Sequence, residues 1–272
     1  MPEGPSVRKF QLLTSRFVGQ VVTKVGGSSK KINAGDLNAL RLQDSQVHGK
    51  NLFLAFTAAI SPSGPSVEET VLQEEAASGS LQNTTNGSGM SVATDLLSAS
   101  PRLVLYFESG GFLVFYNCQM HWCSPPVTDP TSDILSAEFH RGQALDALCT
   151  PRPVCYTLMD QRYFSGLGNI IKNEILYLAK IHPLTQGSLL VQSDLEHLLD
   201  CAIQFTSEWL QSKLQGKGLH LQIYQKEQCP LGHVVRKGAL GPPDGWKRLT
   251  WWCPHCQPAM LSGDGDLTLD TE

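Results

Sequence analysis

Two kinds of hydrophobic periodicity divide the chain. Near the N-terminus, apolar residues recur every three or four positions over residues 6–17, which predicts an amphipathic helix. Short apolar runs follow and predict strands over residues 21–25, 37–42 and 46–56. Two further runs flank the sequence Glu-Ser-Gly-Gly and predict a β-hairpin over residues 102–117. The first part of the chain is therefore expected to be mainly β-structure.

Helical spacing returns after residue 129. Apolar positions predict helices within residues 134–148, 154–160, 170–180 and 193–214. Asn169 follows Gly-Leu-Gly and stands where the N-cap of the third helix is expected. Backbone amides at such a helix start attract anions, for example a DNA phosphate, although an ordinary helical pair needs no such function.

A polar segment interrupts the β-rich part. Residues 57–100 are rich in Ser, Thr, Gly, Asn and Glu, so they are expected to form a disordered insert without a strand pair. Residues 259–272 are expected to form a disordered acidic tail. The chain has a net charge of −4, and neither segment contains Lys or Arg. The remainder is therefore net positive and can face phosphates.

The most specific chemical pattern lies near the C-terminus. Cys229 and His233 form one short pair, and Cys253 and Cys256 form a second pair farther along the chain. Three thiolates and one imidazole at this spacing can close a tetrahedral structural zinc site. His255 is an alternative fourth ligand. The competing interpretation is that these are four unrelated residues.

A turn-rich sequence separates the two pairs. Gly-Pro-Pro-Asp-Gly at residues 241–245 precedes an apolar run over residues 246–252, which predicts a β-hairpin held at its base by zinc. Lys247 and Arg248 directly follow the turn.

Cysteine usage bears on the cellular compartment. The chain shows no apolar signal segment at its start and no apolar run long enough to span a membrane. The compartment is therefore expected to be reducing. The cysteines outside the two pairs are expected to be free thiols: Cys118, Cys123, Cys149, Cys155 and Cys201.

The N-terminal sequence Met-Pro-Glu offers a nucleophile. If Met1 is removed, Pro2 becomes a secondary amine that is partly unprotonated near neutral pH. Such an amine condenses with a sugar aldehyde carbon to a cationic iminium, and the Glu3 carboxyl could donate and accept protons beside it. The competing interpretation is a frayed, proline-rich terminus, and these residues alone favour it.

Gly49 and Lys50 lie within the third predicted strand. The glycine permits close approach of another backbone or of a ligand. Lys50 is a candidate phosphate contact or second catalytic amine. A solvated lysine at the edge of a strand is the competing interpretation, which the sequence alone favours.

Four motifs occur in an order known from one protein family. They are an N-terminal Pro-Glu-Gly-Pro, Gly-Lys on an early strand, Gly-Leu-Gly-Asn at a helix start and a zinc hairpin that carries an arginine. Outside the insert and the tail, the chain resembles the Fpg/Nei family of DNA glycosylases. The resemblance implies an α+β fold with an N-terminal β-sandwich, a helix–two-turn–helix domain and a C-terminal zinc-finger β-hairpin, with DNA in the cleft between.

The resemblance also implies residue roles and domains. Pro2 forms a Schiff base with C1′ of the damaged nucleotide, and Glu3 donates a proton. Lys50 becomes a catalytic and phosphate-contacting lysine. Asn169 and Arg248 hold the DNA backbone around the lesion, and Arg248 counts among the catalytic residues. The implied domains are a catalytic sandwich (1–128), a helix–two-turn–helix DNA-binding domain (129–220), a zinc finger (221–258) and the acidic tail (259–272).

These roles predict a bifunctional enzyme of base excision repair. It is expected to remove oxidised bases, mainly pyrimidines, from damaged DNA and to cut the strand by β,δ-elimination. Single-stranded and bubble DNA are expected to be favoured over duplex DNA, because less unpairing is required. We expect a nuclear monomer with structural zinc and no membrane contact; a cytoplasmic or mitochondrial fraction is an alternative. Two other classes stay open: a non-catalytic nucleic-acid-binding module, and a scaffold that recruits repair proteins through the acidic insert or tail.

Overall fold

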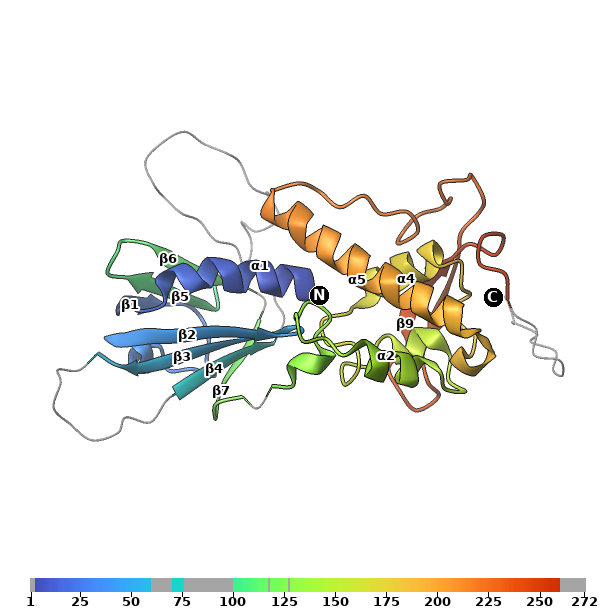
Figure 1. Cartoon of the computed structure of the whole chain (residues 1–272). Helices are drawn as coiled ribbons and strands as arrows, with labels where there is room; N and C mark the ends of the chain where they lie inside the picture. Colours follow the sequence, from blue (N-terminus) through green and yellow to red (C-terminus); the bar gives the residue numbers. More distant parts are fainter. Residues whose placement is uncertain (1–2, 60–69, 76–99, 117, 127, 260–272) are drawn as a thin grey trace. The chain divides into compact units, whose positions relative to one another are not determined.

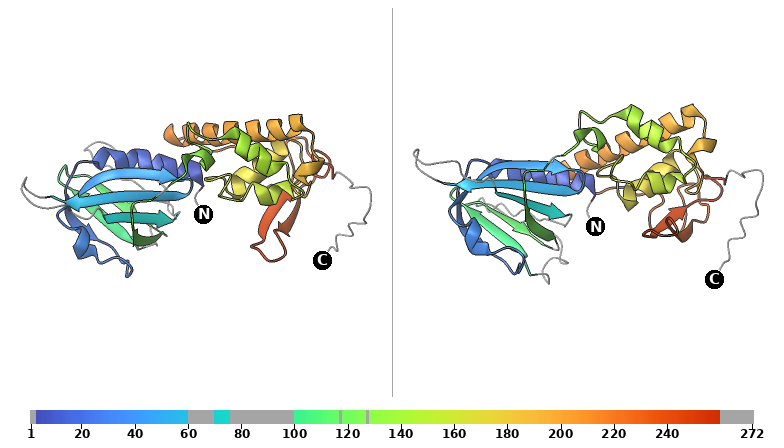
Figure 2. Two further views of the ribbon diagram at one scale, coloured as in Figure 1. Left: turned by 60° about the horizontal axis from the view of Figure 1, so that its bottom comes forward. Right: turned by 90° about the horizontal axis from the view of Figure 1, so that it is seen from below.

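The structure is a computed structural model that describes residues 3–59, 70–75, 100–116, 118–126 and 128–259. The chain divides into two compact units, whose elements are shown in Figures 1 and 2. Unit 1 comprises Met1–Phe139 and Thr206–Gly218, and unit 2 comprises His140–Phe205 and Leu219–Glu272. The hairpin near the C-terminus groups with the preceding helices in unit 2, and the expected domain boundaries stay a prediction.

Unit 1 contains two antiparallel sheets that share one hydrophobic core. The first sheet has the order β1 (Val22–Gly26), β5 (Leu103–Phe107), β6 (Phe112–Phe115). The second has the order β2 (Leu40–His48), β3 (Asn51–Ala58), β4 (Thr70–Glu75), β7 (Gln119–Cys123). The helices are α1 (Gly4–Thr14) and the 3₁₀ helices η1 (Ser15–Phe17), η2 (Ala34–Leu37) and η4 (Pro130–Ser132). The expected β-sandwich is confirmed.

The helix α1 and the turn η1 pack against this core, where the sequence predicted one helix over residues 6–17. Phe10 of α1 meets Phe115 of β6 edge-to-face, with 5.2 Å between ring centroids. Phe17 of η1 stacks on Phe107 of β5 at 4.5 Å. All four rings are buried. Aromatic packing of this kind anchors the start of the chain to the first sheet.

Strands β2 and β3 form a hairpin where the sequence predicted one strand over residues 46–56. His48 pairs with Asn51, so Gly49 and Lys50 make a two-residue turn. Gly49 has a φ of 55°, and a glycine at the first position of such a turn adopts positive φ without strain. The prediction of a single strand was wrong because apolar positions continue on both sides of the turn.

Strand β4 lies inside the segment 57–100 that composition predicted to be a disordered insert without a strand pair. It pairs antiparallel with β3 on one side and with β7 on the other. For this strand the prediction was wrong, because ladder partners on both sides override the weak propensity of a polar sequence. Residues 60–69 and 76–99 of the predicted insert lie outside the described residues.

Unit 2 consists of helices and a C-terminal hairpin. Its elements are α2 (Arg141–Leu148), α3 (Val154–Thr157), α4 (Asn169–Leu178), the 3₁₀ helix η5 (Gly187–Leu189), the first part of α5 (Gln192–Leu214), β8 (Arg236–Leu240) and β9 (Arg248–Trp252). Gly168 occupies the N-cap of α4, so Asn169 is the first helical residue and not the predicted cap. The predicted hairpin over residues 241–252 is confirmed, with β8 as its first strand.

Two further expectations concern the whole chain. None of the helices in the described ranges is long and apolar enough to cross a membrane. The cysteines expected to be free thiols form no disulfide. Most of the predicted acidic tail, residues 260–272, lies outside the described part of the chain.

Candidate functional site

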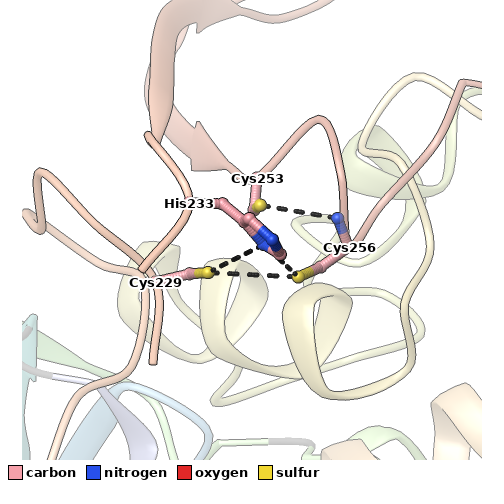
Figure 3. Close-up of side chains that lie close together, drawn as sticks. All are labelled: Cys229, His233, Cys253 and Cys256. Atoms are coloured by element: carbon pink, nitrogen blue, oxygen red, sulfur yellow. Dashed lines mark hydrogen bonds between the residues drawn. The ribbon is translucent and has the colours of Figure 1, made fainter. Parts of the chain in front are cut away.

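Four potential metal ligands converge in unit 2 (Figure 3). The ligand atoms of Cys229, His233, Cys253 and Cys256 all lie within 4.8 Å of one another. Cys229 Sγ is 3.6 Å from His233 Nδ1 and 3.9 Å from Cys256 Sγ, and Cys256 Sγ is 3.4 Å from His233 Nδ1. Zinc bonds of about 2.3 Å to sulfur and about 2.0 Å to nitrogen place tetrahedral ligands roughly 3.5–3.8 Å apart. The spacing therefore fits a zinc ion.

Two tight turns present these ligands. In the first, the Gly232 amide donates to the Cys229 carbonyl at 2.8 Å, and the Cys229 amide donates to the His233 carbonyl at 2.9 Å. Gly232 has a φ of 80°, which few residues with a Cβ adopt. In the second, the Gln257 amide donates to the Cys253 carbonyl at 2.8 Å, and the Gln257 side chain accepts from the Cys253 amide at 2.9 Å. Each turn fixes its own ligands.

The surroundings of Cys229 favour the thiolate, the form that binds zinc. Burial alone would raise the pKa of this thiol. Hydrogen bonds from the backbone amides of Leu231 and His233, together with one from the Tyr177 hydroxyl, outweigh burial and lower the pKa of Cys229 to about 6. Burial and the bond to Cys229 raise the pKa of Tyr177, which therefore stays a proton donor. The chain thus provides a thiolate ligand at neutral pH.

His255, the alternative fourth ligand, lies beside this group and is not part of it. Its ring stacks on that of His233, with 4.7 Å between ring centroids and 26° between the ring planes. The nitrogen that approaches the sulfur atoms is Nδ1 of His233. This geometry favours His233 as the ligand.

A ring of polar groups joins the first turn of α4 to β9. Lys172 Nζ donates to Asn169 Oδ1 at 2.8 Å and to Thr250 Oγ1 at 2.7 Å. Asn169 Nδ2 donates to the Leu249 carbonyl at 2.9 Å, and Thr250 Oγ1 donates to the Arg248 carbonyl at 3.0 Å. Lys172 is 1% exposed, and a buried ammonium is tolerated only when its donors are paired. The ring therefore holds Asn169 beside the strand that begins at Arg248.

Two more buried side chains of α4 bind the C-terminal part of unit 2. Asn173 Oδ1 accepts from the Trp251 amide at 2.7 Å, and its Nδ2 donates to the Asn169 carbonyl at 2.7 Å. The Glu174 carboxylate accepts from the backbone amides of residues 222–224 at 2.8, 3.0 and 2.8 Å. These bonds dock the zinc hairpin and the chain before it onto one helix.

In unit 1, Glu3 stands at the N-cap of α1. Its carbonyl accepts from the amides of Ser6 at 2.8 Å and Val7 at 3.3 Å, and the residue is 4% exposed. Lys50 is half-buried in the turn between β2 and β3. Pro2 lies outside the described residues, so its role stays a prediction.

Asp133 supports both α1 and the turn that contains Lys50. Its Oδ2 accepts from the Gly49 amide at 3.0 Å and lies 3.5 Å from a guanidinium nitrogen of Arg8 on α1. Its Oδ1 accepts from the Leu135 amide at 2.9 Å. With 3% exposure, this carboxylate is a buried link between the first helix and the turn.

The predicted residues thus fall into two groups. Glu3 and Lys50 belong to unit 1, whereas Asn169, Arg248 and the four metal ligands belong to unit 2. Asp133 and the polar residues 172–174, which support these two groups, were not predicted from the sequence. The signal for residues 172–174 was available, because three successive polar residues interrupt an otherwise apolar predicted helix.

The sequence is similar to known DNA glycosylases. Residues 129–219 match the family model described as the formamidopyrimidine-DNA glycosylase H2TH domain. The mouse protein "Endonuclease 8-like 2" is 49% identical over 320 residues, which cover 96% of this chain and 97% of the mouse protein. Its human counterpart is 48% identical over 322 residues, with coverages of 96% and 97%. These alignments are longer than the 272 residues of this chain, so the relatives carry residues that it lacks.

Solved structures share the fold. A viral DNA glycosylase aligns with a TM-score of 0.70 at 20% identity, covering 94% of this chain and 99% of that protein. The Lactococcus lactis Fpg in complex with abasic-site DNA aligns with a TM-score of 0.71 at 19% identity, covering 94% and 100%. The expected α+β architecture, with its sandwich, helix–two-turn–helix domain and hairpin, is therefore confirmed.

The ligand geometry predicts one zinc ion per chain. Chelation should remove it and abolish DNA binding, because the cluster of buried residues around the hairpin is too small to hold its shape. Metal analysis and DNA-binding measurements before and after chelation check this. Cys256→Ser should lower the zinc content, and His255→Ala should leave it at one. Folded protein that binds DNA without zinc would contradict the prediction.

The polar ring predicts a stability loss. Lys172→Met leaves Asn169 Oδ1 and Thr250 Oγ1 without this donor, which should lower the free energy of unfolding by about 1–3 kcal/mol. Lys226→Met, a change at an exposed lysine of the same unit, should have little effect. Urea denaturation measures both variants, and a double-mutant cycle with Thr250→Val should show coupling. Additive effects in that cycle would show that Lys172 and Thr250 do not stabilise the protein through their hydrogen bond.

Proposed function

We propose, because this chain belongs to the Fpg/Nei family of DNA glycosylases, that it is a bifunctional glycosylase and abasic-site lyase. Its substrates are oxidised bases, mainly pyrimidines, in single-stranded or bubble DNA, and it acts as a monomer in the nucleus. The observation that carries the proposal is the 49% identity to mouse "Endonuclease 8-like 2" over 97% of that protein.

The reaction starts at the N-terminus after removal of Met1. The Pro2 nitrogen attacks C1′ while Glu3 donates a proton to O4′ and the bond between C1′ and O4′ opens. The base then leaves with the proton that Pro2 loses, which gives a cationic iminium. Loss of the C2′ proton sends an electron pair into the iminium and expels the 3′ phosphate. A second elimination expels the 5′ phosphate, and water releases the sugar remnant from Pro2.

Unit 1 supports these roles through burial and a shared anchor. Glu3 is almost completely buried at the start of α1, so its carboxyl is removed from bulk water. Asp133 binds the Gly49 amide beside Lys50 and pairs with Arg8 of the same helix. The helix start and the Lys50 turn therefore share one rigid support. Lys50 then contacts a phosphate or serves as a second amine.

Unit 2 supports a grip on the DNA backbone. The Asn169 amide nitrogen carries two hydrogens; one goes to the Leu249 carbonyl, and the second can donate to a phosphate oxygen. Arg248 is exposed at the start of β9, and a guanidinium binds phosphate with directed donors. Bound zinc supplies a structural cross-link at the base of this hairpin.

A non-catalytic nucleic-acid-binding module is the second candidate. The observation that favours it is the greater length of the aligned relatives, which carry residues missing from this chain. The two candidates differ at Pro2, because only the enzyme needs this amine unblocked.

Borohydride trapping tests the proposal. Incubation with DNA that contains an abasic site should give a covalent protein–DNA adduct that maps to Pro2, since borohydride reduces the iminium. Retaining Met1 converts the nitrogen to an amide and should abolish the adduct. Mass spectrometry of the trapped peptide identifies the residue.

Folding and binding must be matched in that comparison. Both proteins should show the same cooperative melting transition and the same affinity for abasic-site DNA. If the blocked protein still forms the adduct, the nucleophile is another amine, with Lys50 as the first to replace. If the unblocked protein binds DNA without any adduct, the chain is a binding module.

Glu3→Gln should separate the two reaction steps. Excision of an oxidised base should fall by about 10²-fold or more, the usual contribution of a positioned general acid. Strand scission at a preformed abasic site should fall less, because no base has to leave. Gel assays on the two substrates measure the steps separately, with the exposed Glu138→Gln as the matched control. Equal losses on both substrates would contradict this role for Glu3.

A further inference from the structure

The tip of the zinc hairpin exposes a tryptophan. Trp246 is 91% exposed, the highest fraction among the large apolar side chains that the structure describes. It lies in the turn between β8 and β9, one position before Lys247. Tryptophan is usually well buried, and an exposed one often marks a binding surface. None of the roles described so far involves this side chain.

Two exposed cationic residues, Lys247 and Arg248, directly follow Trp246. Four exposed cationic residues lie in the same hairpin, and Asp244 is its single carboxylate. An aromatic ring among cationic groups is the combination with which proteins bind single-stranded nucleic acid, because bases stack on the ring while the cations neutralise phosphates. The cationic residues are Lys247 in the turn and Arg248 of β9, which adjoin Trp246, and Arg236 and Lys237 of β8, which lie at the other end of the hairpin opposite Trp252 and Trp251.

The turn that carries the tryptophan is tightly constrained. The Gly245 amide donates to the Pro242 carbonyl at 3.1 Å. A Cβ on Gly241 would lie 2.5 Å from the Trp246 carbonyl oxygen, and a Cβ on Gly245 would lie 2.5 Å from Pro242 Cγ. These close approaches require glycine at both positions, and they define the course of the backbone on either side of Trp246.

We propose that Trp246 is a stacking platform for an unpaired nucleobase of single-stranded DNA, with Lys247 and Arg248 on the adjoining phosphates. This inference deepens the proposed preference for single-stranded or bubble DNA and rests on that part of the proposed function. In a duplex the bases already stack on one another, so the ring has no exposed base face to bind. The platform therefore favours unpaired strands.

The test compares variants on undamaged DNA. Trp246→Ala should bind a single-stranded oligothymidylate about 10-fold more weakly than the unchanged protein, while its affinity for a duplex of the same length changes little. Trp246→Phe keeps an aromatic face and should recover most of the affinity. Val191→Ala removes another exposed apolar side chain of unit 2 and should bind like the unchanged protein. Fluorescence anisotropy of labelled DNA measures these affinities.

A second readout is the fluorescence of the Trp246 indole ring. Oligothymidylate should quench part of the tryptophan fluorescence in the unchanged protein, and this part should be missing in Trp246→Ala. Zinc content and melting temperature should be the same in all variants, which separates stacking from folding. Unchanged single-strand affinity in Trp246→Ala, or an equal loss on both DNA forms, would overturn the proposal.

This test is independent of catalysis. Binding to undamaged DNA needs neither Pro2 nor Glu3, so a failure of borohydride trapping would remove the enzymatic proposal and leave the stacking result intact. Conversely, the unchanged protein could trap abasic-site DNA while Trp246→Ala binds single strands normally. The enzymatic proposal would then stand, and the stacking proposal would be wrong.

Discussion

The hairpin β8–β9 has too little apolar surface to fold alone, and unit 2 is built around this constraint. The cluster of buried residues beside it is small and includes Tyr177 of α4. Zinc ligands close its base, and buried polar groups of α4 hold β9. Among these groups Lys172 most needs hydrogen-bond partners, because a buried ammonium costs several kcal/mol unless its donors are paired. Asn169 and Thr250 supply the pairing, so the helix start and the strand are fixed as one piece.

Unit 1 also contains a buried charged side chain, but here it is a carboxylate and not an ammonium group. The buried carboxylate of Asp133 needs donors, and it takes them from Arg8 of α1 and from the Gly49 amide. In both units the groups assigned to DNA or chemistry are positioned by a buried ion on a neighbouring segment. Such an ion has few acceptable arrangements, because every donor or acceptor must be paired. The need to pair every donor and acceptor of Lys172 and Asp133 therefore restricts the conformation of neighbouring residues that have little apolar packing of their own.

Sequence reasoning succeeded where the signal was local. The ligand pairs around Cys229 and Cys253 could be found because metal coordination imposes short spacings, and the finger hairpin follows from its turn residues. The missed features depend on distant partners. Lys172 bonds a residue 78 positions away, and Asp133 bonds one 84 positions away. Strand β4 likewise depends on β3 and β7 for its hydrogen bonds, and no pattern within its own residues reports them.

Stability and recognition are separated along the finger hairpin. Its base is buried, from Thr250 to Trp252, and is held by zinc ligands and α4. Its tip, from residue 243 to residue 249, is exposed. Because the tip bonds to the polar ring only through the backbone carbonyls of Arg248 and Leu249, its side chains are not required for the core and can be cationic or aromatic at little cost in stability. A rigid glycine–proline turn then keeps Trp246 in solvent, where folding gains nothing from the ring and only a ligand can bury it.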